Sequence, residues 1–311
     1  MKSFFLIIGI LFSLHINAQI LDINKPLFSD EPFFNEKFIR ANKVKSIQGA
    51  RSSKKVKDII RTKGLNFFYV FDVNGLLSKQ MATFHNTTNQ CKDTNLIEYS
   101  YTPNKLLKFT RKSDAYGFYS NRYFYDHQNR LIKQTYHREE NVCSSKNNFQ
   151  LGKEYEISAD SFSYQKLSDE QVKKIFYNNY HKPYKEEISY YDDLGYLKEI
   201  YSKFLIGNKK SKTTYEYDEK GRMIKMIHFS DLSKNSYSTE EYFYDNLDNI
   251  LEIKIYENDK YITSKQFLYD KKTFLLTAQI IQDVPTEFIR IIQYQYTFYN
   301  GETTSLSFEE N

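Results

Sequence analysis

One short unit of aromatic residues followed by a turn recurs along this chain, about every 26 residues. The clearest copy runs from Tyr215 to Met223 and reads Tyr-Glu-Tyr-Asp-Glu-Lys-Gly-Arg-Met. Another copy runs from Tyr123 to Leu131. Each copy of such a repeat is one supersecondary unit packed on its neighbours, so the repeat constrains the fold more than any other feature does.

Each copy predicts a strand, a tight turn and a second strand. Aromatics at alternate positions share one face of a strand, and the Asp that follows them can accept a hydrogen bond from a backbone N–H two residues on. Gly or Asn three residues after the Asp tolerates a left-handed backbone, as a type I turn with a G1 bulge requires. Lys105 and Thr273 stand at that place in two copies, so we expect those turns to be built differently. The residues that define the repeat include Tyr99, Tyr101, Tyr123, Tyr125, Asp126, Tyr215, Tyr217, Asp218, Gly221, Tyr242, Tyr244 and Asp245.

The number of copies predicts an all-β fold. Seven copies and an irregular one at Tyr294 to Thr297 give a long antiparallel meander of about 16 strands. Because open twisted sheets rarely exceed about 10 strands, we expect this one to curl into an open barrel, trough or partial shell. The spacing is irregular between Asp126 and Asp192, where a capping pattern at Ser168 to Gln171 predicts a short helix.

The N-terminal part has a different composition. Residues 1–18 carry Lys2 and then an apolar stretch too short to span a bilayer, which predicts a signal peptide and export. Residues 19–64 form a lead-in with a short helix and an edge strand, and residues 65–311 form the repeat domain. The helix is expected after the capping residues Ser29 and Asp30, with Phe34 and Phe38 on its apolar face, and the edge strand at Val44 to Ile47.

Charge and cysteine content narrow the possible functions. The net charge is +5, and the basic stretch from Lys43 to Lys63 indicates a solvated edge in preference to a nucleic-acid site. An exported chain with two cysteines favours a disulfide, here between Cys91 and Cys143.

No catalytic motif, metal-ligand spacing or cofactor fingerprint stands out in the sequence. The histidines are expected at the surface or in turns, and the repeated Asp residues as turn caps. The tyrosine rows either form the core or line a binding face, with the core favoured. Function is expected where the repeat breaks, from Cys143 to Tyr190, and in the rim loops.

Five copies carry a charged residue seven positions after the turn Asp, and these residues argue against membrane insertion. They are expected on the face shared with the aromatics, where a lipid-facing band would not tolerate them. These residues are Lys79, Lys133, Glu199, Lys225 and Glu252.

The string Tyr-x-Tyr-Asp-x-x-Gly-Arg-Leu resembles the YD repeat of the RHS/YD-repeat family. Tyr215 to Met223 matches it with Met in the Leu place, and Tyr123 to Leu131 matches it with Asn129 in the Gly place. The resemblance implies β-hairpins that spiral into a shell. It is closer to small exported YD-repeat-like proteins of Gram-negative bacteria than to the large toxin-enclosing members.

The leading hypothesis is a non-enzymatic exported protein that acts as a binding or structural module of the periplasm, cell surface or extracellular space. Its partner would be a protein, a glycan or an envelope component, without nucleic acid, cofactor, metal or membrane-spanning helix. One alternative is a periplasmic carrier of an apolar ligand or lipid in a half-barrel cavity. Another is an outer-membrane β-barrel.

Overall fold

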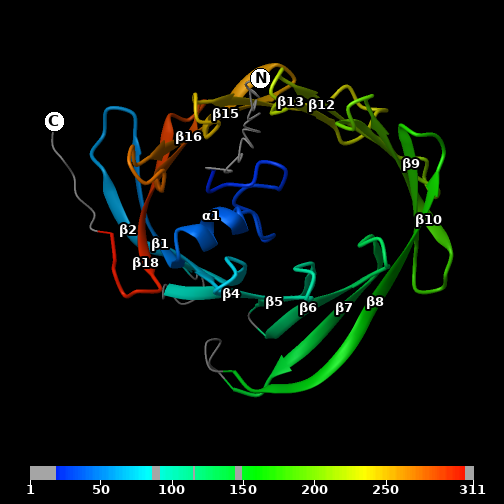
Figure 1. The fold of residues 1–311 in the computed structure, drawn as a ribbon, viewed down its shortest axis with the longest axis horizontal. Helices are drawn as coiled ribbons and strands as arrows, with labels where there is room; N and C mark the ends of the chain where they lie inside the picture. The colour runs from blue at the N-terminus through cyan, green and yellow to red at the C-terminus, as the bar shows by residue number, and fades with distance from the viewer. Residues whose placement is uncertain (1–18, 86–91, 115, 144–148, 305–311) are drawn as a thin grey trace, which may run out of the picture.

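The chain folds into a closed antiparallel β-barrel (Figure 1). The computed structural model describes residues 19–85, 92–114, 116–143 and 149–304. Its 18 strands follow one another around the wall in sequence order. β1 (Val44–Lys55) pairs with β18 (Phe288–Phe298) and closes the ring. The predicted all-β meander is confirmed, and the expected edge strand at Val44 has a neighbour on both sides.

The other elements are one short helix and the strands between β1 and β18. They are α1 (Glu36–Ala41), β2 (Arg61–Phe71), β3 (Leu77–His85), β4 (Lys92–Tyr101), β5 (Leu107–Ser113), β6 (Gly117–Tyr125), β7 (Leu131–Asn141), β8 (Leu151–Lys166), β9 (Gln171–Tyr177), β10 (Pro183–Tyr191), β11 (Leu197–Phe204), β12 (Lys210–Tyr217), β13 (Met223–Phe229), β14 (Ser238–Tyr244), β15 (Ile250–Glu257), β16 (Lys260–Tyr269) and β17 (Leu276–Asp283).

The irregular interval of the sequence is occupied by β8 and β9. The helix predicted at Ser168 to Gln171 is wrong, because Lys166 still pairs with Val172 and only a tight turn fits between the two strands. In that turn the Leu167 N–H donates to the Gln171 carbonyl at 2.9 Å.

The repeat turns follow the predicted chemistry. Asp218 Oδ1 accepts hydrogen bonds from the N–H groups of Lys220 at 3.0 Å and Arg222 at 2.9 Å, and Gly221 has a φ of 76°. The pairing register shifts between Glu216 and Tyr217, as a bulge requires. Lys105 adopts the left-handed conformation itself, with a φ of 62°, so its turn has the ordinary form. The turn containing Thr273 is longer by one residue, as the left-handed Phe274 shows.

The second tyrosine of the repeat links adjacent hairpins. The Tyr217 hydroxyl donates to the Leu197 carbonyl at 2.9 Å, which joins one hairpin to the one before it. Phe would pack equally well but could not make this bond, which explains the preference for Tyr. The same link joins Tyr101 to Leu77, Tyr125 to Leu107, Tyr164 to Leu131, Tyr244 to Met223 and Tyr296 to Leu276.

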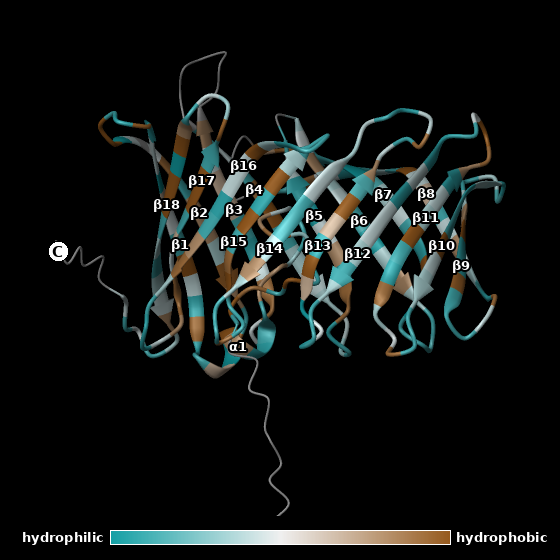
Figure 2. Cartoon of the chain, turned by 90° about the horizontal axis from the view of Figure 1, so that it is seen from above, coloured by the Kyte–Doolittle hydropathy of each residue, from teal (hydrophilic) through white to brown (hydrophobic). Residues whose placement is uncertain are grey.

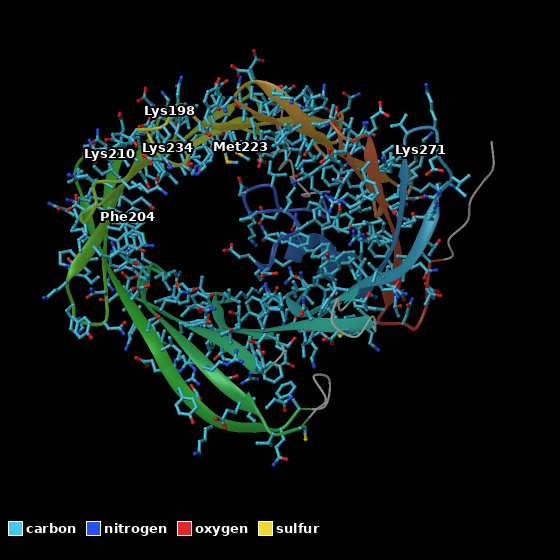
Figure 3. All side chains as sticks on the ribbon, turned by 180° about the vertical axis from the view of Figure 1, so that it is seen from behind. Lys198, Phe204, Lys210, Met223, Lys234 and Lys271 are labelled. Carbon is cyan, nitrogen blue, oxygen red and sulfur yellow. The ribbon has the colours of Figure 1, made fainter. Side chains whose placement is uncertain are left out.

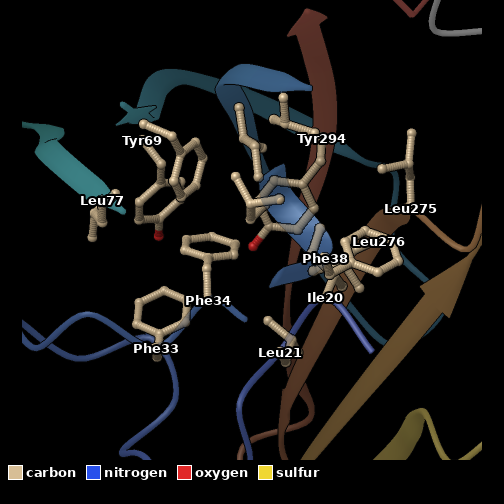
Figure 4. Packing of buried hydrophobic residues seen from close by; sticks show 14 of the residues in the cluster. Ile20, Leu21, Phe33, Phe34, Phe38, Tyr69, Leu77, Leu275, Leu276 and Tyr294 are labelled. Carbon is tan, nitrogen blue, oxygen red and sulfur yellow. The ribbon is translucent and has the colours of Figure 1, made fainter. Parts of the chain in front are cut away.

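Residues 19–42, here called the inner segment, lie inside the barrel and form its core with the wall. Phe34 packs edge-on against Tyr69 at 4.9 Å and Phe71 at 5.1 Å, and Figure 4 shows Phe38 beside Tyr294. Inner-facing residues of β1, β2, β17 and β18 belong to the same cluster. The tyrosine rows therefore point inward, and the inner segment covers them on one side of the barrel.

The helix of the inner segment begins later than predicted. Asn35, not Ser29 or Asp30, caps α1 through bonds from the N–H groups of Lys37 and Phe38. The helix lies close to the first repeat turn, where a Cβ added to Gly75 would come within 2.2 Å of the Glu36 carbonyl oxygen. Figure 2 places α1 at the rim of the tight turns, while the connections of the opposite rim vary more in length.

Candidate functional site

The lumen is packed on one side and accessible to solvent on the other. On the packed side, Ile292, Tyr294 and Tyr296 of β18 are all buried. Across the barrel, every residue of β9 and β13 is half-buried, on both faces of the wall. Figure 1 shows β9 and β10 far from the inner segment, and in Figure 3 the wall around Phe204 and Met223 borders a space that no drawn side chain fills.

The lining of this accessible half can be traced through the strand register. Directly paired residues point to the same face, so the lumen face continues from Tyr123 of β6 round to Tyr242 of β14. Between these strands aromatic and aliphatic side chains alternate with polar ones such as Ser202, Thr213 and His228. The aromatic and aliphatic residues include Phe162, Tyr164, Val172, Phe176, Ile200, Phe204, Tyr215, Tyr217 and Met226.

An ammonium group lies among the rings of this lining. Lys174 Nζ is 4.3 Å from the ring centroid of Phe162, 4.7 Å from that of Phe176 and 5.7 Å from that of Tyr164. Burial lowers the pKa of Lys174, and the nearby charge of Lys185 lowers it further, against the opposing effect of Glu187. None of the ion pairs among the described residues includes Lys174.

A second ammonium group shares the same ring. Lys185 Nζ lies 4.5 Å from the Phe176 centroid and 3.0 Å from a carboxylate oxygen of Glu187. The same Glu187 oxygen accepts a hydrogen bond from Ser202 at 3.2 Å. Lys174, Lys185, Glu187 and the three phenylalanines Phe162, Phe176 and Phe204 are here called the lumen cluster.

The outer wall carries ion pairs between neighbouring strands, among polar and apolar side chains. Lys173 pairs with Glu186 at 2.7 Å and Lys79 pairs with Glu98 at 3.1 Å. Further cross-strand pairs join Lys212 to Glu199 and Lys225 to Glu241.

The predicted face of the charged row is therefore wrong. Lys225 is paired with Glu216, not beside Tyr215, because the bulge at Tyr217 shifts the register by one residue. Lys79, Lys133, Glu199 and Glu252 likewise pair with outward-facing neighbours: Val70, Phe124, Tyr190 and Phe243.

A buried charge cluster lies on the outer face near the rim of variable connections. Arg111 bonds to Glu139 at 2.5 Å and to Glu98 at 3.3 Å, and its guanidinium lies 4.8 Å from the Phe109 ring centroid. Ser120 donates to Glu139 at 2.9 Å. Because these donors satisfy the Glu139 carboxylate, we interpret the cluster as a structural ion pair.

The residues predicted to define the repeat occupy three environments. Tyr99 and Tyr242 are buried. The half-buried lumen-facing tyrosines are Tyr101, Tyr123, Tyr125, Tyr215, Tyr217 and Tyr244, and the turns hold Asp126, Asp218, Gly221 and Asp245.

The predicted disulfide and histidine positions have different outcomes. Cys143 is exposed, while Cys91 lies outside the described residues, so their pairing stays a prediction, as does the signal peptide at 1–18. His137 is buried and bonds to Thr135 at 2.8 Å, contrary to the expected surface position. Among the described residues no three His, Cys, Asp or Glu side chains are grouped to hold a metal ion.

Sequence reasoning did not identify the lumen cluster, although most of the cluster lies in the stretch where function was expected. Five of its six residues lie between Cys143 and Tyr190, where the repeat breaks. The available sequence signal was that the aromatic residues Phe162 and Tyr164, like Lys174 and Phe176, stand two positions apart and so share one face of a strand. It could not show which face would be inside.

Comparisons with known proteins show distant structural likenesses. No protein-family model matches the chain, and no curated protein matches it. A porin-like protein from Bacteroides uniformis is similar over 82% of this chain and 97% of its own, with 12% identity and a TM-score of 0.38. A porin-like protein from Bacteroides vulgatus has 9% identity and a TM-score of 0.30, over 70% of this chain and 96% of its own.

A chain of the Photorhabdus luminescens Tc holotoxin pore is also similar, with 12% identity and a TM-score of 0.17. The match covers 78% of this chain and 19% of that one. Likenesses this weak do not identify a function. Within the described part of the chain, no helix has the length and apolar character needed to cross a membrane.

Proposed function

We propose that this protein is an exported, non-enzymatic barrel that binds an apolar ligand in the accessible half of its lumen. The observation that carries the proposal is that aromatic side chains on the lumen face stay in contact with solvent there. Phe204 faces the lumen and is still 37% exposed. On the other side of the barrel, the inner segment covers equivalent residues.

Covering such a lining is energetically favourable. Burial of apolar surface stabilises by about 25 cal/mol per Å², so a ligand that fills the space beside Phe162, Phe176 and Phe204 would gain affinity from area alone. Binding sites for small molecules are commonly apolar concavities with a few polar groups. The lumen combines these features inside a closed wall.

A pair of phenylalanines tests the proposal. Phe204 and Phe243 have similar exposure, 37% and 41%, but Phe204 faces the lumen and Phe243 the outer wall. Titration with the neutral fluorescent probe N-phenyl-1-naphthylamine should show binding that Phe204→Ser weakens about fivefold or more and Phe243→Ser leaves unchanged. Failure of the unaltered protein to bind the probe, or equal losses in both variants, would contradict the proposal.

An outer-membrane barrel is the second candidate. The even number of strands, and tight turns on one rim opposite more variable connections on the other, are typical of that class. The outer wall opposes it, because the charged residues Glu98 and Lys254 lie well inside their strands on that face. Each Lys or Arg near the bilayer midplane would cost about 2–4 kcal/mol.

A further inference from the structure

We infer that the ligand of the lumen is an anionic amphiphile, whose charged head binds between Lys174 and Lys185 and whose apolar body lies against the surrounding phenylalanines. The inference rests on the proposed function and adds the chemical class of the ligand.

The charge of the lumen cluster is unbalanced. Two ammonium groups share one carboxylate, and one oxygen of that carboxylate already accepts from Lys185 at 3.0 Å and from Ser202 at 3.2 Å. Lys174 lies opposite Glu187 in the strand register, but among the described residues it forms no ion pair, and its Nζ lies close to the rings of Phe162, Tyr164 and Phe176. Two half-buried cations that share a single carboxylate are unfavourable, and burial lowers the pKa of Lys174. An anion would compensate the excess charge.

The two lysines can serve one head group. Their Nζ atoms lie 4.7 and 4.5 Å from the same Phe176 ring centroid, so both charges are close to one ring, and an anionic head group placed between them would be attracted by both. The rings of Phe162 and Phe204 flank the two lysines, since Phe162 pairs with Phe176 and Phe204 pairs with Lys185. An apolar chain attached to the head would therefore meet apolar surface on either side.

The neighbouring lysine provides a matched control. Lys173 and Lys174 are adjacent on β9, but Lys173 points outward and pairs with Glu186 at 2.7 Å. Lys→Met substitution keeps the length and removes the charge. Lys174→Met should thus affect the head-group site, while Lys173→Met should affect only the outer wall.

The test is calorimetric titration of the full barrel with decanoate and with 1-decanol, which share an apolar chain and differ in charge. The unaltered protein should bind decanoate about tenfold more tightly than 1-decanol. Lys174→Met should abolish this preference, whereas Lys174→Arg and Lys173→Met should retain it.

The outcomes separate the two proposals. Equal affinity for both probes, or a preference that survives in Lys174→Met, would overturn the anionic head while leaving apolar binding in place. If neither probe binds, the proposed function fails and the inference fails with it. Circular dichroism of each variant shows whether a loss of binding reflects a loss of folding.

Discussion

At the scale of single residues, the repeat places each residue type for a physical reason. Tyrosine supplies both an inward-facing ring and a hydroxyl that reaches the preceding hairpin, as Tyr125 does through the Leu107 carbonyl at 2.8 Å. Asp caps the turn, and Gly or Asn takes the left-handed position that closes it. These roles are structural, so the copies that obey the rule build the wall, and we expect binding where the repeat varies.

Substitution of two glycines separates the cost of backbone strain from the cost of side-chain crowding. Gly195 and Gly221 occupy the same turn position with φ values of 84° and 76°. A Cβ at Gly195 would meet nothing within 4 Å, whereas one at Gly221 would lie 2.1 Å from the Tyr196 hydroxyl oxygen and 2.7 Å from Cζ of its ring. We expect Gly195→Ala to cost about 1–2 kcal/mol of unfolding free energy, and Gly221→Ala to cost at least about 1 kcal/mol more. Urea denaturation of both variants measures the difference, and equal costs would refute the crowding argument.

At the scale of elements, the inner segment stabilises one side of the barrel. Phe34 is buried between Tyr69 and Phe71, whereas Phe124, on the outer wall, is 46% exposed. Phe34→Ala should therefore cost about 3–5 kcal/mol, and Phe124→Ala less than about 1 kcal/mol. Chemical denaturation provides the comparison. A small effect of Phe34→Ala would mean that the inner segment does not contribute to the core.

The sequence predicted the hairpins well because their signals are local. Aromatic alternation and the Asp-x-x-Gly turns specify strand, turn and bulge without distant partners. The side of the wall that Lys225 occupies was mispredicted, because one bulge reverses the face of every residue beyond it. The position of Phe34 inside the barrel depends on contacts with β2, about 35 residues away, which no local pattern contains.

At the scale of the whole molecule, closure removes the exposed sheet edges that an open meander would have. Closure could not be predicted from the sequence, because the strands that meet, β1 and β18, are separated by nearly the entire chain. The unequal filling of the lumen could not be predicted either, since Lys174 and Phe176 remain uncovered only because the inner segment lies on the opposite side. Function is thus proposed where the wall is left uncovered.

The buried tyrosines predict an alkaline limit to stability. Burial raises the pKa of Tyr69, Tyr294 and Tyr296 above the ordinary value of about 10. Because these groups ionise more readily in the unfolded chain, their contribution is intact below about pH 10 and is lost as pH rises toward the folded-state pKa. Tyrosinate absorbance should show a first, reversible step from exposed tyrosines and a later one coinciding with loss of circular dichroism. Complete ionisation while the barrel stays folded would contradict the buried positions.

The central claim is that the outer wall faces water and the binding surface is inside. Fractionation of Gram-negative cells expressing the full chain tests it most directly. The account predicts that the mature protein is released by osmotic shock or found in the medium without detergent, and remains monodisperse there. Recovery only from the outer membrane, and only with detergent, would contradict the account and favour the membrane barrel.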